Sequence, residues 1–122
     1  MESEEQKAAI GTVELCGQVL YLRWRTGAAV GESDAKAMMN HVTELCSGRA
    51  LPMLVQLASM EWIDRRAQEV FAAQWPLLRT AIVGTSPVDE VIAGFYTARH
   101  NPACPTRFFT STDEAMTWLT EE

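Results

Sequence analysis

The feature of this chain that most restricts its fold is an apolar segment near the middle that leads into a helical pattern. From Leu51 to Leu57 only Gln56 is polar, so both faces of the segment are apolar, as is typical of a strand covered on both sides. Gly48 precedes the segment, a polar turn at 59–61 follows it, and Asp64 opens a helical repeat. We therefore predict a strand in the middle of a sheet, then a turn and a helix.

Two β-like segments near the beginning of the chain predict a hairpin. Residues 10–15 and 19–25 flank Cys16-Gly17-Gln18, and the glycine suits a tight turn. In the second segment Leu20, Leu22 and Trp24 alternate with Val19, Tyr21, Arg23 and Arg25. We expect the first set to face the core, and the second face to be half wet, as in an edge strand. Tyr21 is expected to be a sheet aromatic, with a subunit contact as the alternative.

Helical spacing recurs in two segments of the first two thirds of the chain. The first is predicted to begin at a Ser33 cap and to end at Ser47-Gly48, with a buried stripe of Ala35, Met38, Val42 and Leu45. His41 lies off this stripe and is expected to be solvated. The second follows Asp64 and is predicted to run through Ala67, Val70, Phe71 and Trp75 until Pro76 breaks it.

Two further helices are predicted in the last third, each after a short strand. A strand at 79–83 leads to Ser86 as a cap and Pro87 as the first helical residue, with Asp89 in the first turn. This helix is expected to fray at Arg99-His100 and to bury Val88, Val91, Ile92 and Phe95. A strand at 106–109 then precedes a helix that Ser111 caps and that buries Ala115, Trp118 and Leu119.

Together these elements predict an α/β fold. We expect a single-layer, mixed and mostly parallel β-sheet with an N-terminal antiparallel hairpin and about four helices packed on it. Residues 1–9 contain three acids and no periodic apolar face, so they are expected to be a flexible acidic terminus. Residues 10–122 are expected to form one domain.

Charge and cysteine content narrow the function classes. A net charge of −6 without a Lys/Arg block disfavours nucleic acid as a partner. No apolar run approaches the length of a membrane span, and the opening residues are acidic, so a cytoplasmic location is expected. Cys16, Cys46 and Cys104 form no metal-ligand spacing and are interpreted as free thiols, the last two as small buried hydrophobes rather than reactive groups.

The segment PMLVQLASMEWIDRRAQEVF, with its buried strand, turn and Asp-headed helix, resembles the signature region of STAS, or SpoIIAA-like, domains. The later segments NPACPTRFF and DEAMTWL resemble an uncharacterised bacterial STAS/SEC14-like branch of that fold, so the likeness covers about residues 10–120. The resemblance implies a regulatory module in which a Ser or Thr directly after that Asp, at the start of the helix, is phosphorylated. Arg65 stands at that position here and cannot accept a phosphoryl group. Asp64 is interpreted as a helix N-cap.

Helix starts at the carboxyl ends of parallel strands are the expected place for a site. We predict a ligand- or partner-binding rim there, formed by Ser59, Asp64, Arg65, Arg66, Thr85 and Ser86. The two arginines would attract an anion; alternatively they are solvated or pair with Glu61 and Glu69. A secondary basic loop is predicted at Arg99, His100 and Arg107, with a solvated loop as the alternative.

The sequence contains no recognisable catalytic constellation, phosphate-binding glycine loop or metal cluster, so no catalytic residue, metal or cofactor is expected. The leading hypothesis is a non-catalytic STAS-like module that binds a protein partner or self-associates. The alternative is a carrier or sensor of SEC14-like type, with an apolar pocket under the helices lined by Met, Phe and Trp. An enzyme with a closed cleft around Asp64 and Ser86 is a weaker third hypothesis.

Overall fold

The computed structural model of the chain describes residues 11–58, 62–73, 75–99 and 104–121, and at 95–99 it describes the backbone only. The elements in these ranges are β1 (Gly11–Cys16), β2 (Val19–Trp24), β3 (Ala29–Val30), α2 (Glu32–Cys46), β4 (Leu51–Gln56), β5 (Trp62–Ile63), α3 (Arg65–Ala72), β6 (Leu77–Val83), α4 (Pro87–Arg99), β7 (Thr106–Phe109) and α5 (Thr112–Leu119). The predicted acidic terminus at 1–9 and the turn at 59–61 lie outside the described residues.

The main sheet has five strands in the order β1-β2-β4-β6-β7. β1 and β2 are antiparallel and every other neighbouring pair is parallel, which confirms the predicted mixed sheet and its N-terminal hairpin. Gly17 turns the hairpin with a φ of 63°, a left-handed conformation that glycine adopts without strain. β4 lies at the centre, as its two apolar faces predict.

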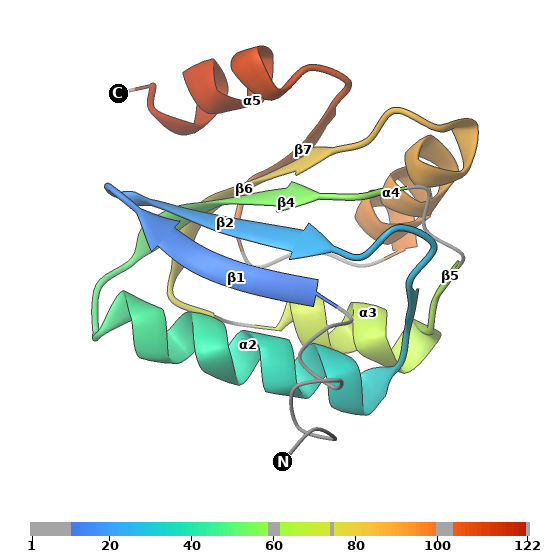
Figure 1. The fold of residues 1–122 in the computed structure, drawn as a ribbon, viewed down its shortest axis with the longest axis horizontal. Coiled ribbons are helices and arrows are strands. Elements are labelled where there is room, and N and C mark those ends of the chain that lie inside the picture. Colours follow the sequence, from blue (N-terminus) through green and yellow to red (C-terminus); the bar gives the residue numbers. More distant parts are fainter. Residues whose placement is uncertain (1–10, 59–61, 74, 100–103, 122) are drawn as a thin grey trace.

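Helices cover both faces of this sheet (Figure 1). α2, α3 and α4 lie over one face, where they bury Leu20, Leu22 and Met53. α5 lies on the opposite face, over β4, β6 and β7, and packs Ala115 and Leu119 against Leu54 and Ala81. Within the described residues no helix has the length and apolar character needed to cross a bilayer.

The prediction that β2 is an edge strand is wrong. Leu20, Leu22 and Trp24 do face the core, with at most 4% of each exposed, but β2 lies between β1 and β4. Its other face is partly covered by α5, so Val19 is buried, and the Tyr21 hydroxyl lies 3.5 Å from the Met116 sulfur. The prediction failed because Arg23 and Arg25 place charge on that face of the strand, a pattern that is typical of an edge strand.

Two helix boundaries differ from those predicted. The N-cap of α2 lies two residues before the expected one: Gly31 occupies this position and donates its N–H to the Asp34 carboxylate, 3.1 Å away, while Ser33 lies inside the helix. α3 ends at Ala72, so Trp75 is not helical. Trp75 directly precedes Pro76, and the residue before a proline is disfavoured in the helical conformation because its backbone clashes with the proline ring.

α4 is rotated relative to the prediction. The expected cap is confirmed, because the Ser86 hydroxyl accepts from the Asp89 N–H at 3.1 Å and the Asp89 carboxylate accepts from the Ser86 N–H at 3.4 Å. Asp89 is fully buried, whereas Val88 and Val91 are 49% and 55% exposed, so their assignment to the buried stripe is wrong. Apolar residues occur on both sides of this helix, so the apolar pattern does not determine which side is buried. The Asp89 carboxylate, which caps the helix, is buried, and the side that carries Asp89 therefore faces inward. The side chain of Phe95 lies outside the described residues.

Between the hairpin and α2 the structure contains a short strand, β3, that the sequence does not signal. β3 and β5 pair in parallel as a separate two-stranded sheet, and the Asp64 N–H donates to the Val30 carbonyl at 2.8 Å. Each strand has two residues, which is too short for an alternating pattern to show. The pair nevertheless ties the beginnings of α2 and α3 together.

Candidate functional site: an apolar cavity

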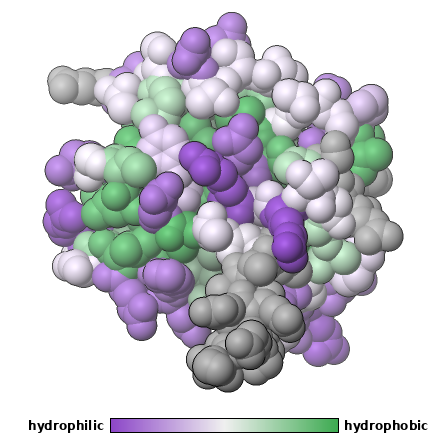
Figure 2. All heavy atoms as spheres, in the orientation of Figure 1, coloured by the Kyte–Doolittle hydropathy of each residue, from purple (hydrophilic) through white to green (hydrophobic). Residues whose placement is uncertain are grey.

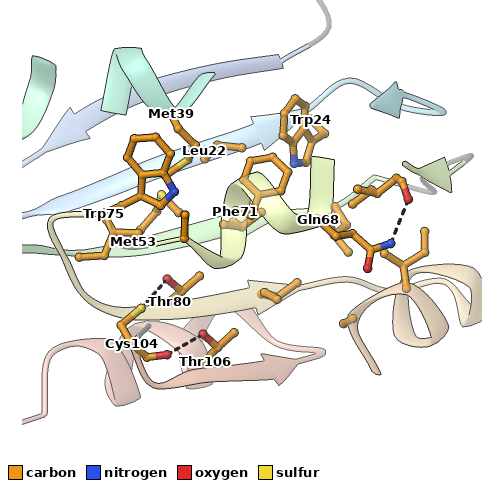
Figure 3. Close-up of a pocket in the computed structure, with 18 residues that line it drawn as sticks. Leu22, Trp24, Met39, Met53, Gln68, Phe71, Trp75, Thr80, Cys104 and Thr106 are labelled. Atoms are coloured by element: carbon orange, nitrogen blue, oxygen red, sulfur yellow. Dashed lines mark hydrogen bonds between the residues drawn. The ribbon is translucent and has the colours of Figure 1, made fainter. Parts of the chain in front are cut away.

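A cavity lies between the sheet and the helices α3 and α4 (Figure 3). The non-atom space in and around it is about 760 Å³, a volume that includes solvent at the open mouth. Strands β2, β4, β6 and β7 form its floor, and α2, α3, α4 and the segments beside them complete it. The lining residues are Leu22, Trp24, Met39, Met53, Val55, Leu57, Ile63, Gln68, Phe71, Ala73, Trp75, Leu77, Thr80, Ile82, Ile92, Ala93, Cys104 and Thr106.

Aromatic rings and thioethers form a large part of the cavity lining. Phe71 meets Trp24 edge to face, with ring centroids 5.8 Å apart and an interplanar angle of 67°, a favourable aromatic geometry. The Trp75 indole N–H donates to the Val70 carbonyl at 2.7 Å, which satisfies a carbonyl at the end of α3 and holds the ring beside the cavity. Met39 and Met53 add flexible side chains that can adapt to a ligand.

Polar groups gather at one corner of the cavity. Thr80 and Thr106 are paired neighbours on β6 and β7. The Thr80 hydroxyl lies 3.4 Å from the Cys104 sulfur, and the Thr106 hydroxyl donates to the Cys104 carbonyl at 3.0 Å (Figure 3). We call Thr80, Cys104 and Thr106 the threonine corner.

A register irregularity aims Thr80 into the cavity. The pairing of β4 with β6 shifts between Leu51 and Met53, because Leu51 pairs with Leu77 but Met53 with Thr80. The residue between them is Pro52, which cannot donate a ladder hydrogen bond and favours such irregularities in strands. The extra residue in β6 reverses the alternation, so that Leu77 and Thr80 both line the cavity.

None of the described residues that line the cavity carries a charged side chain. Gln68 is the polar lining residue contributed by α3, and its amide donates to the Ile63 carbonyl at 3.0 Å. An ion enclosed in such a site would lose its hydration without a compensating partner. The lining of the cavity therefore suits neutral, mainly apolar groups better than ions.

The predicted rim lies apart from this cavity, since none of its described residues lines it. Thr85 and Ser86 follow β6, and Asp64 to Arg66 follow β5. Among the described residues, neither Thr85 nor Ser86 forms a hydrogen bond or an ion pair with the segment from Asp64 to Arg66. Ser86 acts as the cap of α4, while Ser59 lies outside the described residues. A binding role for the rim stays a prediction.

The two arginines after Asp64 are on the surface. Arg65 is exposed, and Arg66 lies 3.8 Å from the Glu32 carboxylate rather than pairing with Glu69. Asp64 occupies the N-cap position of α3, but its side chain makes no capping hydrogen bond. The ion pair is largely exposed and contributes little to stability.

The predicted basic loop is described only in part. Arg107 projects toward α5, with its guanidinium carbon 5.5 Å from the centre of the Trp118 ring and 5.1 Å from that of Phe109. His100 and the side chain of Arg99 lie outside the described residues. The loop as a recognition site stays a prediction.

The three cysteines occupy different environments. Cys46 is buried and its thiol lies 3.5 Å from the Pro76 carbonyl; burial raises the pKa of this thiol, against a smaller lowering effect of Arg49. This fits the expected small buried hydrophobe. Cys104 is only partly buried and lines the cavity, whereas Cys16 is exposed. Within the described part of the chain no three His, Cys, Asp or Glu side chains group as a metal site.

Sequence reasoning anticipated an apolar pocket under the helices but not the residues of its polar corner. Thr80 is a polar residue inside an apolar strand, which is a weak signal for an inward polar group. Cys104 and Thr106 gave no such signal, because only the pairing of β6 with β7 brings them beside Thr80.

Comparison with solved structures supports the fold. An uncharacterised protein of the DUF3478 family with a SpoIIAA-like fold, from Shewanella loihica PV-4, superposes with a TM-score of 0.62 at 14% identity, covering 89% of this chain and 91% of that one. At this identity the likeness concerns the fold alone, and it confirms the SpoIIAA-like architecture.

Three further findings concern sequence similarity. A protein with unknown function from Arthrobacter sp. FB24 is 39% identical over 91% of this chain and all of that one, with a TM-score of 0.37. No curated protein matches this chain at a significant level. Residues 13–122 match the family described as Domain of unknown function (DUF7793). This match spans most of the sequence, and the chain therefore belongs to the DUF7793 family.

Proposed function

We propose that this protein is a non-catalytic binding domain whose cavity holds a small, neutral, mainly apolar molecule, as a carrier or sensor does. The observation that carries the proposal is the cavity itself, whose described lining contains aromatic rings, thioethers and aliphatic groups but no charge. Enclosing apolar surface there gains about 25 cal/mol per Å². A cytoplasmic setting, in which such a domain would meet small metabolites, belongs to the same proposal.

Methionine methyl NMR on the intact protein tests this function, with methyl pentyl ether and n-hexanol as neutral probes. Met39 and Met53 line the cavity, whereas Met116 lies on α5 against the other face of the sheet. We expect saturable shifts of the Met39 and Met53 methyl signals and no shift of the Met116 signal. Unchanged spectra, or equal shifts at all three positions, would contradict the proposal.

A pair of alanine variants links the shifts to the cavity. Ala73 is exposed and lies at the cavity, whereas Ala37 is exposed on α2 and does not line it. Ala73→Phe is expected to fill the mouth and weaken probe binding at least about tenfold, since it competes for the same apolar contacts. Ala37→Phe is the matched control and should bind as the original protein does.

The interaction module implied by the STAS-like resemblance is the second candidate function, and the exposed face of α4 favours it. Val88 and Val91 are one helical turn apart and about half exposed, as expected for a contact surface. Figure 2 shows one face of the molecule, on which hydrophilic and hydrophobic residues are intermixed. Because Arg65 replaces the phosphorylatable residue, this module would act without that switch.

Light scattering after size exclusion tests this second candidate as self-association, with a protein partner as the other form of the hypothesis. If α4 mediates it, the original protein is dimeric and Val91→Lys is monomeric, whereas Lys at the exposed Ala37 leaves the dimer intact. A concentration-independent monomer would exclude self-association through α4.

A further inference from the structure

The threonine corner has a donor and acceptor arrangement that selects among neutral molecules. The Thr106 hydroxyl donates its single proton to the Cys104 carbonyl, so toward the cavity it can act only as a hydrogen-bond acceptor. Between the Thr80 hydroxyl and the Cys104 thiol, 3.4 Å apart, either atom can be the donor. This weak pair can therefore turn a proton toward a ligand atom.

A ligand hydroxyl complements both features at once. It can donate to the Thr106 oxygen and accept from the Thr80 and Cys104 pair, because a hydroxyl is both a donor and an acceptor. An ether oxygen accepts only, and leaves the Thr106 lone pairs without a donor. A carboxylate also only accepts, and it would bring a charge into a cavity whose described lining has none.

We propose that the cavity binds an apolar alcohol, with its hydroxyl at Thr80, Cys104 and Thr106 and its hydrocarbon part against Phe71 and Trp75. This inference rests on the proposed function and narrows its ligand to one chemical class. Thr80 is 8% exposed, so the hydroxyl would bind where little water competes for its hydrogen bonds. The rest of the ligand then extends over the apolar lining (Figure 3).

Three probes of similar size separate the alternatives in titrations followed by the Met39 and Met53 methyl signals: n-hexanol, methyl pentyl ether and hexanoate. We expect n-hexanol to bind about tenfold more tightly than either of the others, because the ether lacks one of the two buried hydrogen bonds and hexanoate carries a charge. Equal affinity for the alcohol and the ether would overturn the inference and leave the proposed function standing. Absence of binding by all three would contradict both.

Isosteric variants assign the preference to the corner. Thr106→Val and Thr80→Val should each lower the affinity for n-hexanol toward that for the ether, while ether binding persists and shows that the cavity is intact. Thr117→Val is the matched control, because Thr117 is exposed on α5 and its hydroxyl donates to the Asp113 carbonyl. An alcohol preference that survives both corner substitutions would overturn the assignment.

Discussion

At the scale of single residues, close contact decides which side chains the fold accepts. Gly84 follows β6, and a Cβ added there would lie 2.6 Å from the Asp89 Cβ. Asp89 is fully buried and forms the reciprocal cap of α4 with Ser86. The glycine is therefore required by the approach of a neighbouring side chain rather than by its backbone conformation.

Gly84→Ala is expected to lower the free energy of unfolding by about 1–3 kcal/mol, because the new methyl group must displace Asp89. Urea denaturation measures the change. Gly94→Ala is the matched control: its added Cβ meets nothing within 4 Å, and alanine in a helix should raise stability by about 0.5–1 kcal/mol. Equal effects at the two positions would contradict this view of Gly84.

Thiol reactivity should follow burial. Cys16 is exposed, whereas burial raises the pKa of Cys46, and the thiolate is the reactive form. Iodoacetamide at pH 8 should modify Cys16 first and Cys46 only after unfolding, as peptide mass spectrometry would show. Because the folded-state pKa of Cys46 is raised, its contribution to stability is present below the unfolded pKa and is lost as pH rises through the folded value. Early alkylation of Cys46 in the native protein would contradict its burial.

At the scale of elements, capping determines where helices begin and which side they bury. α5 is held by the Ser111 hydroxyl, which accepts from the Glu114 N–H at 3.3 Å. Its apolar residues Ala115 and Leu119 cover β4 and β6. In α2, by contrast, the serine that pattern alone selects as the cap lies inside the helix.

Ser111→Ala should therefore lower the free energy of unfolding by about 1 kcal/mol through loss of the cap. Ser33→Ala should leave it unchanged or slightly higher, because alanine is the better residue inside a helix. Thermal and urea unfolding of both variants, compared with the original protein, measure the contrast. A larger loss at Ser33 would reverse the assignment of the two caps.

At the scale of the whole molecule, the unequal cover of the sheet accounts for the cavity. α5 packs directly on one face, and the residues between it and the sheet are closely buried. On the other face α3 packs mainly against α2, so β4 and β6 retain empty space above Met53, Thr80 and Ile82. The side chains that line such a cavity lack van der Waals contacts on one side, which costs stability. A ligand that fills the cavity would restore these contacts.

Ligand binding should therefore stabilise the whole fold by linkage. At ten times the dissociation constant, n-hexanol should raise the free energy of unfolding by about 1.4 kcal/mol. The free energy of unfolding of Ala73→Phe should rise less at the same alcohol concentration. This variant also serves as a control, because the alcohol acts on its unfolded state in the same way. Thermal unfolding with and without the alcohol measures both, and equal gains would contradict binding in the cavity.

The sequence by itself determined the order and type of the main elements. The apolar stretch of β4, the glycine turn of the hairpin and the caps at Ser86 and Ser111 depend on local patterns, so they could be predicted from neighbouring residues. The rotation of α4, the cover over β2 and the pairing of β3 with β5 could not, because each depends on distant contacts. The threonine corner of the cavity is of this second kind: Thr80 and Thr106 are 26 positions apart in the chain and meet only when β6 pairs with β7. Tertiary structure alone decided which residues line the cavity, because a cavity is defined by the packing that the surrounding elements leave incomplete.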